Sequence, residues 1–298
     1  MAEVLANSLR FHVHRLPGGD VSRTAGTTAV FLHGLVVDNL SSFYATLAVP
    51  AARAGHDVVL YDLRGHGRTE RPPTGYDIGT AVQDLTALLA ALGLDERSVH
   101  LIGNSYGGTI ALHTALARPD LVAGLVLVEA PLNGPWIENM LDTLSVAALA
   151  LEGSQVPQEL SSLGARKAAR LTATADELLN RTTLIDDIAA SRPFTPADFA
   201  RVRCPVLAVC GEHSELVAGA RELARHAPNC TVRIIPGLGH DVLQGGTEEL
   251  RHAVLDRLAE AARPRSEDAD RSDTSDRTDR TDRTDRSDRS GRAPAVVV

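Results

Sequence analysis

Cysteine is scarce in this chain of 298 residues, with one residue each at positions 204, 210 and 230. Three is an odd number, and the spacing is not that of a metal site, so we expect no metal here. Cys210 also falls inside an apolar run of strand length. The pattern favours a packing role for all three thiols.

Long hydrophobic runs are missing as well. The longest apolar stretches, such as Val99–Ile102 and Leu121–Val128, fall well short of the roughly 20 residues that cross a bilayer. The first residues, MAEVLANSLR, show no basic region followed by an apolar core and a cleavage site. We therefore expect a cytoplasmic protein without a membrane partner.

An excess of positive charge is also absent, since the formal net charge is -8. Binding to nucleic acid would need a basic face, so we expect no nucleic-acid partner. The remaining composition, 44% hydrophobic and 23% charged, is ordinary for a globular protein. A chain of this length is predicted to form one main body with an insertion.

The segment 264–298 differs in character from the rest, because Ser/Thr-Asp-Arg triplets recur through it. Positions 263–292 hold nine acidic and nine basic residues, so the whole net charge of -8 belongs to the body. Such a sequence cannot bury a core. We predict a disordered, solvated extension.

Apolar runs of strand length alternate with stretches of helical period, which is typical of a largely parallel sheet covered by helices. The predicted strands are Arg10–Leu16, Thr28–Leu32, Val58–Asp62, Val99–Gly103, Gly124–Glu129, Val206–Gly211 and Val232–Pro236. The predicted helices are Ser42–Ala54, Gly79–Leu92, Tyr106–Arg118, Val217–His226 and Val242–Ala262. The sequence thus predicts an α/β fold.

Positions 131–196 break this alternation, because they contain helical stretches and no convincing strand. Several helical stretches are predicted, including Trp136–Leu151 and Ala175–Ala190. The first is apolar on most faces, so it can pack on the body and line a cavity at once. We expect an inserted helical cap, with Trp136 and Met140 as candidates for a substrate pocket.

The segment VHLIGNSYGGTIAL places Ser105 in a Gly103-Asn104-Ser105-Tyr106-Gly107 motif between a predicted strand and a predicted helix. This is the strand-turn-helix context that a G-x-S-x-G nucleophile elbow requires. A serine hydroxyl also needs a base and donors for the developing oxyanion. Ser105 is the candidate nucleophile.

Candidates for the base and for the oxyanion hole follow from position. His240, in GLGH, lies after the last predicted strand and just before the last helix, where the base is expected. The backbone N–H groups of Leu35, in HGL, and of Tyr106 would form the oxyanion hole. His33 and His66 are expected to brace loops rather than transfer protons.

Together, HGL, DLRGHGRT, GNSYGG and GLGH resemble the motifs of the α/β-hydrolase superfamily in order and spacing over residues 8 to 262. The resemblance implies a mostly parallel sheet with helices on both faces. It implies a core of residues 1–130 and 197–263, with the cap at 131–196. Loop DLRGHG, with Asp62 and Arg64, is usually structural in this family.

The acid of the catalytic triad departs from the family pattern. The family's usual acid would fall at position 214, which is serine here, with Glu212 and Glu215 as neighbours. Glu129 ends the strand after the nucleophile helix, as the acid does in some haloalkane dehalogenases, coelenterazine luciferases and zearalenone lactonases. Glu129 is favoured as the acid, and Glu212 and Glu215 remain alternatives.

A serine nucleophile favours acyl transfer to water over chemistry through an alkyl ester on aspartate. The cap has eight acidic and five basic residues, so an anionic substrate has little to attract it. We expect a small acyl substrate, a neutral, largely apolar ester or lactone, and no cofactor. Thioesters, acyl transfer or cyclisation, carbon-carbon bond hydrolysis and a non-catalytic binding role are alternatives.

One lysine stands against 29 arginines, which is typical of a GC-rich genome. Hydrolases of this kind often serve secondary metabolism in such genomes. A role on a polyketide-like intermediate is therefore a further hypothesis. The sequence does not indicate an oligomeric state.

Overall fold

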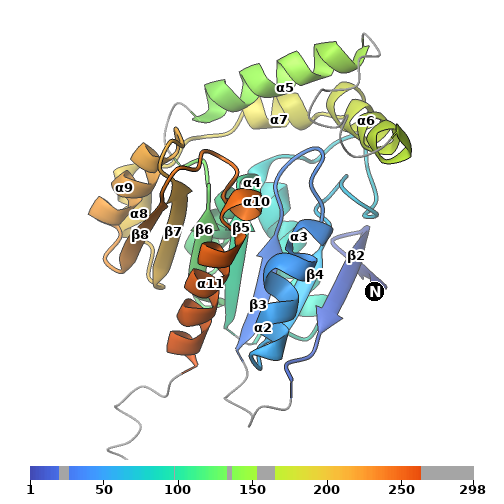
Figure 1. The fold of residues 1–298 in the computed structure, drawn as a ribbon. Helices are drawn as coiled ribbons and strands as arrows, with labels where there is room; N and C mark the ends of the chain where they lie inside the picture. Colours follow the sequence, from blue (N-terminus) through green and yellow to red (C-terminus); the bar gives the residue numbers. More distant parts are fainter. Residues whose placement is uncertain (20–26, 97, 133–135, 153–164, 263–298) are drawn as a thin grey trace, which may run out of the picture. The chain divides into compact units, whose positions relative to one another are not determined.

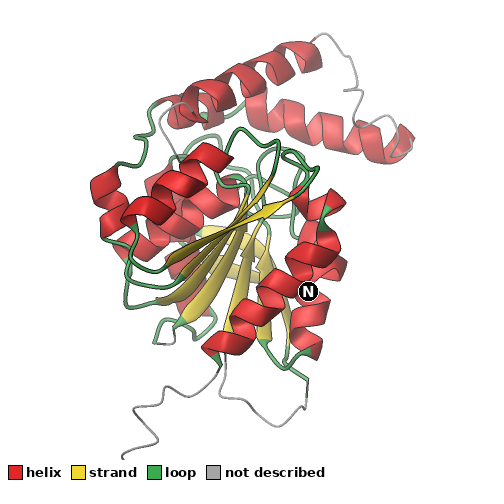
Figure 2. Ribbon diagram, turned by 60° about the vertical axis from the view of Figure 1, so that its left-hand side comes forward, coloured by secondary structure: helices red, strands yellow, loops and turns green. Residues whose placement is uncertain are grey.

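The computed structural model describes residues 1–19, 27–96, 98–132, 136–152 and 165–262. The charged extension predicted for 264–298 lies outside these residues. Within them, no helix is both long enough and apolar enough to cross a membrane. The predicted α/β class is confirmed by a mostly parallel sheet with helices on both faces (Figures 1 and 2).

The sheet has eight strands in the order β1-β2-β4-β3-β5-β6-β7-β8. Strands β1 and β2 pair as an antiparallel hairpin, β2 pairs antiparallel with β4, and all pairs from β4 to β8 are parallel. The strands are β1 (Ala2–Ala6), β2 (Leu9–Leu16), β3 (Thr28–Leu32), β4 (Asp57–Tyr61), β5 (Val99–Asn104), β6 (Val122–Val128), β7 (Val206–Gly211) and β8 (Cys230–Ile235).

Strand β1 was not predicted from the sequence. It is joined to β2 by Asn7 and Ser8, whose φ angles are 45° and 60°. Two consecutive residues at positive φ make the tight turn that suits a hairpin. The Asn-Ser pair is a weaker signal for this turn than Asn-Gly, so the hairpin has no clear mark in the sequence.

The central strands are buried on both faces, so their side chains alternate between two cores. In β3, Val30 and Leu32 join the core shared with α3 (Ile78–Ala91) and α4 (Tyr106–Ala117). Ala29 and Phe31 join the opposite core. That second core is covered by α1 (Ser41–Phe43), the π-helix η1 (Tyr44–Ala48), α2 (Val49–Arg53), α10 (Val242–Gly245) and α11 (Thr247–Ala261).

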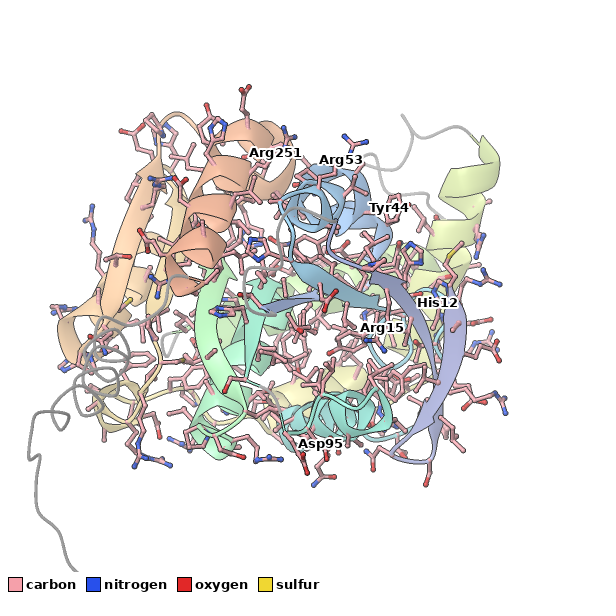
Figure 3. All side chains as sticks on the ribbon, turned by 90° about the horizontal axis from the view of Figure 1, so that it is seen from below. His12, Arg15, Tyr44, Arg53, Asp95 and Arg251 are labelled. Atoms are coloured by element: carbon pink, nitrogen blue, oxygen red, sulfur yellow. The ribbon has the colours of Figure 1, made fainter. Side chains whose placement is uncertain are left out.

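Seen from below, Arg53 and Arg251 lie on one side of the sheet and Asp95, just after α3, lies on the other (Figure 3). The Nε of Arg251 donates to the carbonyl oxygen of Thr46 at 3.0 Å, which ties α11 to η1. The predicted helix Val242–Ala262 is in fact two helices, because the chain breaks at Gly246. Helix α9 (Val217–His226) matches its prediction.

Between β6 and β7 the chain forms α5 (Trp136–Glu152), α6 (Ala165–Asn180), α7 (Leu184–Ala189) and α8 (Pro196–Ala200). Figure 1 shows α5, α6 and α7 together at one end of the strands. The single helix predicted for Ala175–Ala190 is wrong. The chain turns after Asn180, where the N–H of Thr183 donates to Pro73 O at 3.0 Å instead of continuing the helix.

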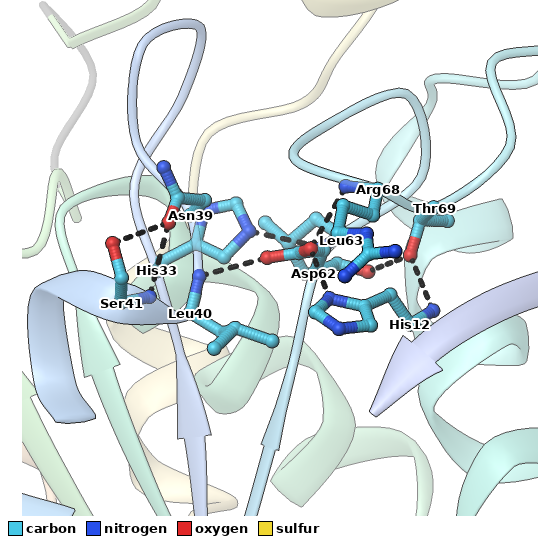
Figure 4. Close-up of polar contacts among 9 residues, drawn as sticks. All are labelled: His12, His33, Asn39, Leu40, Ser41, Asp62, Leu63, Arg68 and Thr69. Atoms are coloured by element: carbon cyan, nitrogen blue, oxygen red, sulfur yellow. Dashed lines mark hydrogen bonds and ion pairs between the residues drawn. The ribbon is translucent and has the colours of Figure 1, made fainter. Parts of the chain in front are cut away.

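The Asp62 carboxylate links several segments beside the sheet (Figure 4). It is 2% exposed. It accepts hydrogen bonds from His12 Nδ1 at 2.7 Å, from Leu40 N at 2.8 Å and from Arg68 N at 2.9 Å. These donors come from β2, from the loop before α1 and from the loop after β4. Asp62 therefore links one strand and two loops.

Arg64 of the same loop donates from Nε and Nη2 to the two carboxylate oxygens of Asp84 on α3, at 2.8 and 2.7 Å. Hydrogen bonding to this carboxylate raises the pKa of the guanidinium despite its burial. Both charged residues of this loop thus have structural contacts.

We predict that Asp62→Asn destabilises the protein by about 1–3 kcal/mol, because an amide nitrogen would then face a buried donor. Urea unfolding measures the change. The exposed Asp95→Asn is the matched control and should leave the midpoint unchanged. Equal midpoints for both variants would contradict the role given to Asp62.

Candidate active site

Ser105 occupies a strained turn between β5 and α4. Its φ and ψ angles are 52° and -124°, a region that residues with a side chain rarely adopt. The turn is held by a hydrogen bond from Ser105 N to Val128 O at 2.8 Å. The strain presents the hydroxyl at the strand's end, beside the first turn of α4.

Two glycines that follow Ser105 are required by the close approach of neighbouring atoms. A Cβ at Gly107 would clash with the carbonyl oxygen of Leu32, and one at Gly108 would lie 2.6 Å from the Cβ of Ala130. The absence of these side chains lets α4 pack tightly between β3 and the end of β6. The motif thus fixes the position of the serine as well as its conformation.

The backbone N–H groups of Leu35 and Tyr106 are both available near Ser105. The neighbours of Leu35 are occupied, since Gly34 N donates to Asp38 Oδ2 at 2.7 Å and Val36 N donates to His66 Nε2 at 2.9 Å. Within the described residues, Leu35 N has no acceptor. Tyr106 is the first residue of α4, where an N–H has no acceptor inside the helix.

The loop of residues 33–38, called the oxyanion loop below for the role predicted from the sequence, also lies against Ser105. A Cβ built on Gly34 would be 3.5 Å from the Cβ of Ser105. Asp38 stabilises this loop, because its carboxylate accepts from Gly34 N through Oδ2 and from the Ser42 hydroxyl through Oδ1. Asn39 N also donates to Asp38 Oδ1, at 2.8 Å.

His33 and His66 brace the oxyanion loop. His33 Nε2 accepts from Leu63 N at 3.0 Å, and His66 Nε2 accepts from Val36 N. A ring nitrogen that accepts a hydrogen bond carries no proton, so both rings are neutral with the proton on Nδ1. Burial, with a smaller contribution from His33, lowers the pKa of His66 to about 3.

Glu129 is the carboxylate that the structure brings to His240. It directly follows β6, is fully buried and has a φ of 47°. Its Oε2 lies 3.3 Å from His240 Nδ1. The other contacts are from Gly211 N to Oε1 and from the Ser214 hydroxyl to Oε2, each at 2.5 Å.

The two alternative carboxylates are placed differently. Glu212 accepts from Gly237 N at 2.9 Å and is exposed. Glu215 is also exposed. Among the described residues, neither forms an ion pair with His240. The serine at position 214 supplies a donor to Glu129 where the family pattern would place the acid.

Gly211 and Ser214 are contributors to this site that the sequence did not reveal. A Cβ at Gly211 would clash with the carbonyl oxygens of Leu238 and Gly239, so glycine lets the histidine loop pack on the end of β7. His213 N donates to Leu238 O at 2.8 Å and fixes the same contact. The serine at an expected acid position was the available signal.

His240 lies on the loop between β8 and α10, with its side chain 47% exposed. Its pKa is raised, first by the hydrogen bond with Glu129 and further by the charges of Glu129, Glu215 and Asp241, while burial opposes the rise. The Glu129 contact thus orients Nδ1 and favours the imidazolium form.

Ser105 and His240 line one cavity of about 520 Å³ under α5. Met140, a candidate for a substrate pocket, also lines it, whereas the side chain of Trp136 lies outside the described part of the chain. Ser105 Oγ forms no hydrogen bond with a described residue. The other residues that line the cavity are Leu35, Val36, Val37, Pro131, Asn139, Thr143, Leu144, Ala147, Glu215 and Leu216.

Residues 29–256 match the model of the alpha/beta hydrolase family. This chain belongs to that family. It is 30% identical over 261 residues to a non-heme chloroperoxidase of Streptomyces lividans, covering 77% of this chain and 91% of the relative. The family predicted from the sequence motifs is therefore confirmed, and the chain is an α/β hydrolase.

Solved structures show the same fold. One is that of Est816, described as an N-acyl homoserine lactone degrading enzyme, with a TM-score of 0.63 and 25% identity over 85% of this chain and 98% of that one. The enol-lactonase from Burkholderia xenovorans LB400 has a TM-score of 0.68 and 18% identity, over 87% of this chain and 100% of that one.

We predict that the pKa of His240 lies above 6.5 and falls in Glu129→Gln, because the variant removes the charge that stabilises imidazolium. An NMR titration of the His240 ring measures both values. Glu212→Gln, which changes the net charge equally, should move the pKa less. A pKa that is the same in wild type and Glu129→Gln would count against the contact.

Proposed function

We propose that this α/β hydrolase is a serine hydrolase that cleaves a neutral, largely apolar ester or lactone through an acyl-enzyme on Ser105. The observation that carries the proposal is that the buried Glu129 lies at hydrogen-bonding distance from His240. His240 and Ser105 line the same cavity. A base held by a buried carboxylate beside a serine in an elbow is the arrangement of nucleophilic acyl transfer.

In the first half of the reaction, Ser105 Oγ attacks the carbonyl carbon while His240 Nε2 takes the hydroxyl proton. Leu35 N–H and Tyr106 N–H donate to the oxyanion of the tetrahedral intermediate. The intermediate collapses as the carbon-oxygen bond to the leaving group breaks, and His240 returns the proton to the leaving oxygen. An acyl ester on Ser105 remains.

In the second half, water attacks the acyl carbon and gives its proton to His240. Collapse of the second intermediate releases the carboxylic acid and returns the proton to Ser105 Oγ. Glu129 takes no part in the proton transfers: it accepts from Gly211 N and Ser214 Oγ and stabilises the imidazolium that forms. Atoms and protons balance over the cycle.

The substrate class follows from the lining of the cavity. Met140, Leu144 and Ala147 form an apolar wall on α5, and Asn139 and Thr143 add neutral polar groups. Apolar walls with a few polar groups suit an acyl chain next to a carbonyl. Est816, a structural neighbour described as degrading a lactone with an acyl substituent, supports the same class of substrate.

We predict that a fluorophosphonate probe labels wild type on Ser105 and leaves Ser105→Ala unlabelled, as mapped by mass spectrometry of peptides. In Glu129→Gln, labelling should slow by about 10³–10⁴-fold, because His240 would be held in the wrong tautomer. Glu212→Gln should be labelled at nearly the wild-type rate. No label on the intact wild type would overturn the proposal.

We also predict that Ala147→Phe shortens the longest acyl chain that is hydrolysed, because the ring would fill space beside α5. The measurement is kcat/KM for p-nitrophenyl esters of increasing chain length. Val146→Phe is the matched control, since Val146 is 68% exposed on the same helix. Identical chain-length profiles for both variants would show that α5 does not wall the acyl site.

A further inference from the structure

One charged side chain stands out in the cavity that holds Ser105. Of the described residues that line it, only Glu215 and His240 are ionisable. His240 forms an ion pair with Glu129, whereas Glu215 forms no ion pair with any described residue. The remaining lining groups are apolar or neutral, so they offer no countercharge.

The position of Glu215 follows from the loop after β7. Ser214 is buried and its Oγ both donates to Glu129 and accepts from Leu216 N at 3.2 Å. This anchoring fixes the backbone on either side of Glu215, whose side chain is exposed and reaches the cavity. Leu216, its other neighbour, is buried and lines the same cavity.

The charge of Glu215 is felt at the reaction centre, because it contributes to the raised pKa of His240. A substrate in the cavity would meet this negative charge without a neighbouring arginine or lysine from the described lining. The body as a whole adds to the effect, since the formal net charge of -8 belongs to it.

We propose that Glu215 is a specificity-determining residue that refines the substrate proposed above: the acyl part is neutral and apolar, and the cavity prefers an alcohol part with an ammonium group over a neutral one, and a neutral one over one with a carboxylate. This inference rests on the proposed ester or lactone hydrolysis at Ser105. It adds a charge preference that apolar walls alone would not produce. Glu215 touches the substrate's charged group and takes no part in proton transfer.

Three isosteric butyrate esters test the preference. Their alcohols are 2-(trimethylammonio)ethanol, 3,3-dimethylbutanol and 4-hydroxy-2,2-dimethylbutanoate, which differ mainly in charge. Binding is measured by calorimetry in the Ser105→Ala background, where no turnover is expected. Turnover is measured in the protein with Ser105 intact. Each measurement is made with Glu215, with Glu215→Gln and with Glu212→Gln, at low and high salt.

With Glu215 present, we expect affinity and kcat/KM to fall in the order cation, neutral, anion, by about two- to fivefold for each unit of charge, the size of an exposed ion pair. Glu215→Gln should abolish the order. Glu212→Gln changes the net charge equally outside the cavity lining and should keep it. High salt should weaken the order, because exposed charges are screened.

The outcomes separate the two proposals. An unchanged order in Glu215→Gln, or equal affinities for all three esters, overturns the role of Glu215 even if every ester is hydrolysed. The charge order in the Ser105→Ala background without turnover in the intact protein supports the role of Glu215 and overturns ester hydrolysis. Absence of both binding and turnover overturns both proposals.

Discussion

A carboxylate that is completely buried must be compensated, and the site is built around that requirement at Glu129. Removing an ion from water costs several kcal/mol unless hydrogen bonds and opposite charge replace the lost hydration. Gly211 N, Ser214 Oγ and His240 provide this compensation from β7, from the loop after it and from the loop after β8. The segments that follow β6, β7 and β8 therefore meet at one side chain.

The parallel sheet makes this meeting possible. Ser105, Glu129 and Gly211 lie at the carboxyl ends of the adjacent strands β5, β6 and β7. The strands are buried on both faces, so they provide a rigid base, and the loops beyond them carry the polar groups. The positive φ angles of Ser105 and Glu129 are local strain that this base sustains.

Much of the fold could be read from the sequence, because buried parallel strands give continuous apolar runs and α4 follows a recognisable turn. Strands β3 and β7 have the predicted bounds. Strand β1 could not be read because an Asn-Ser pair is a weak turn signal, and the break between α6 and α7 could not be read because the bond from Thr183 N to Pro73 O depends on a tertiary partner. The periodicity of apolar residues reports neither the hairpin turn nor the helix break.

For the site, the sequence supplied Ser105 and His240 from motifs but left three carboxylates open. Glu129, Glu212 and Glu215 all lie just after strands, so position alone does not rank them. The structure places only Glu129 against His240 among the described residues. The catalytic roles of these groups stay predictions until the serine is labelled.

The His66 ring that supports the oxyanion loop makes the stability of the protein depend on pH. His66 holds Val36 N only through an unprotonated ring nitrogen, and its pKa is lowered to about 3 by burial. In the unfolded chain the same ring takes up a proton near its ordinary value of 6.5. Its contribution to stability is complete above that pH and is lost as the pH falls toward 3, because the unfolded state then binds the extra proton. Mild acid therefore lowers the free energy of unfolding, while the hydrogen bond from Val36 N to His66 persists in the folded chain until the pH approaches 3.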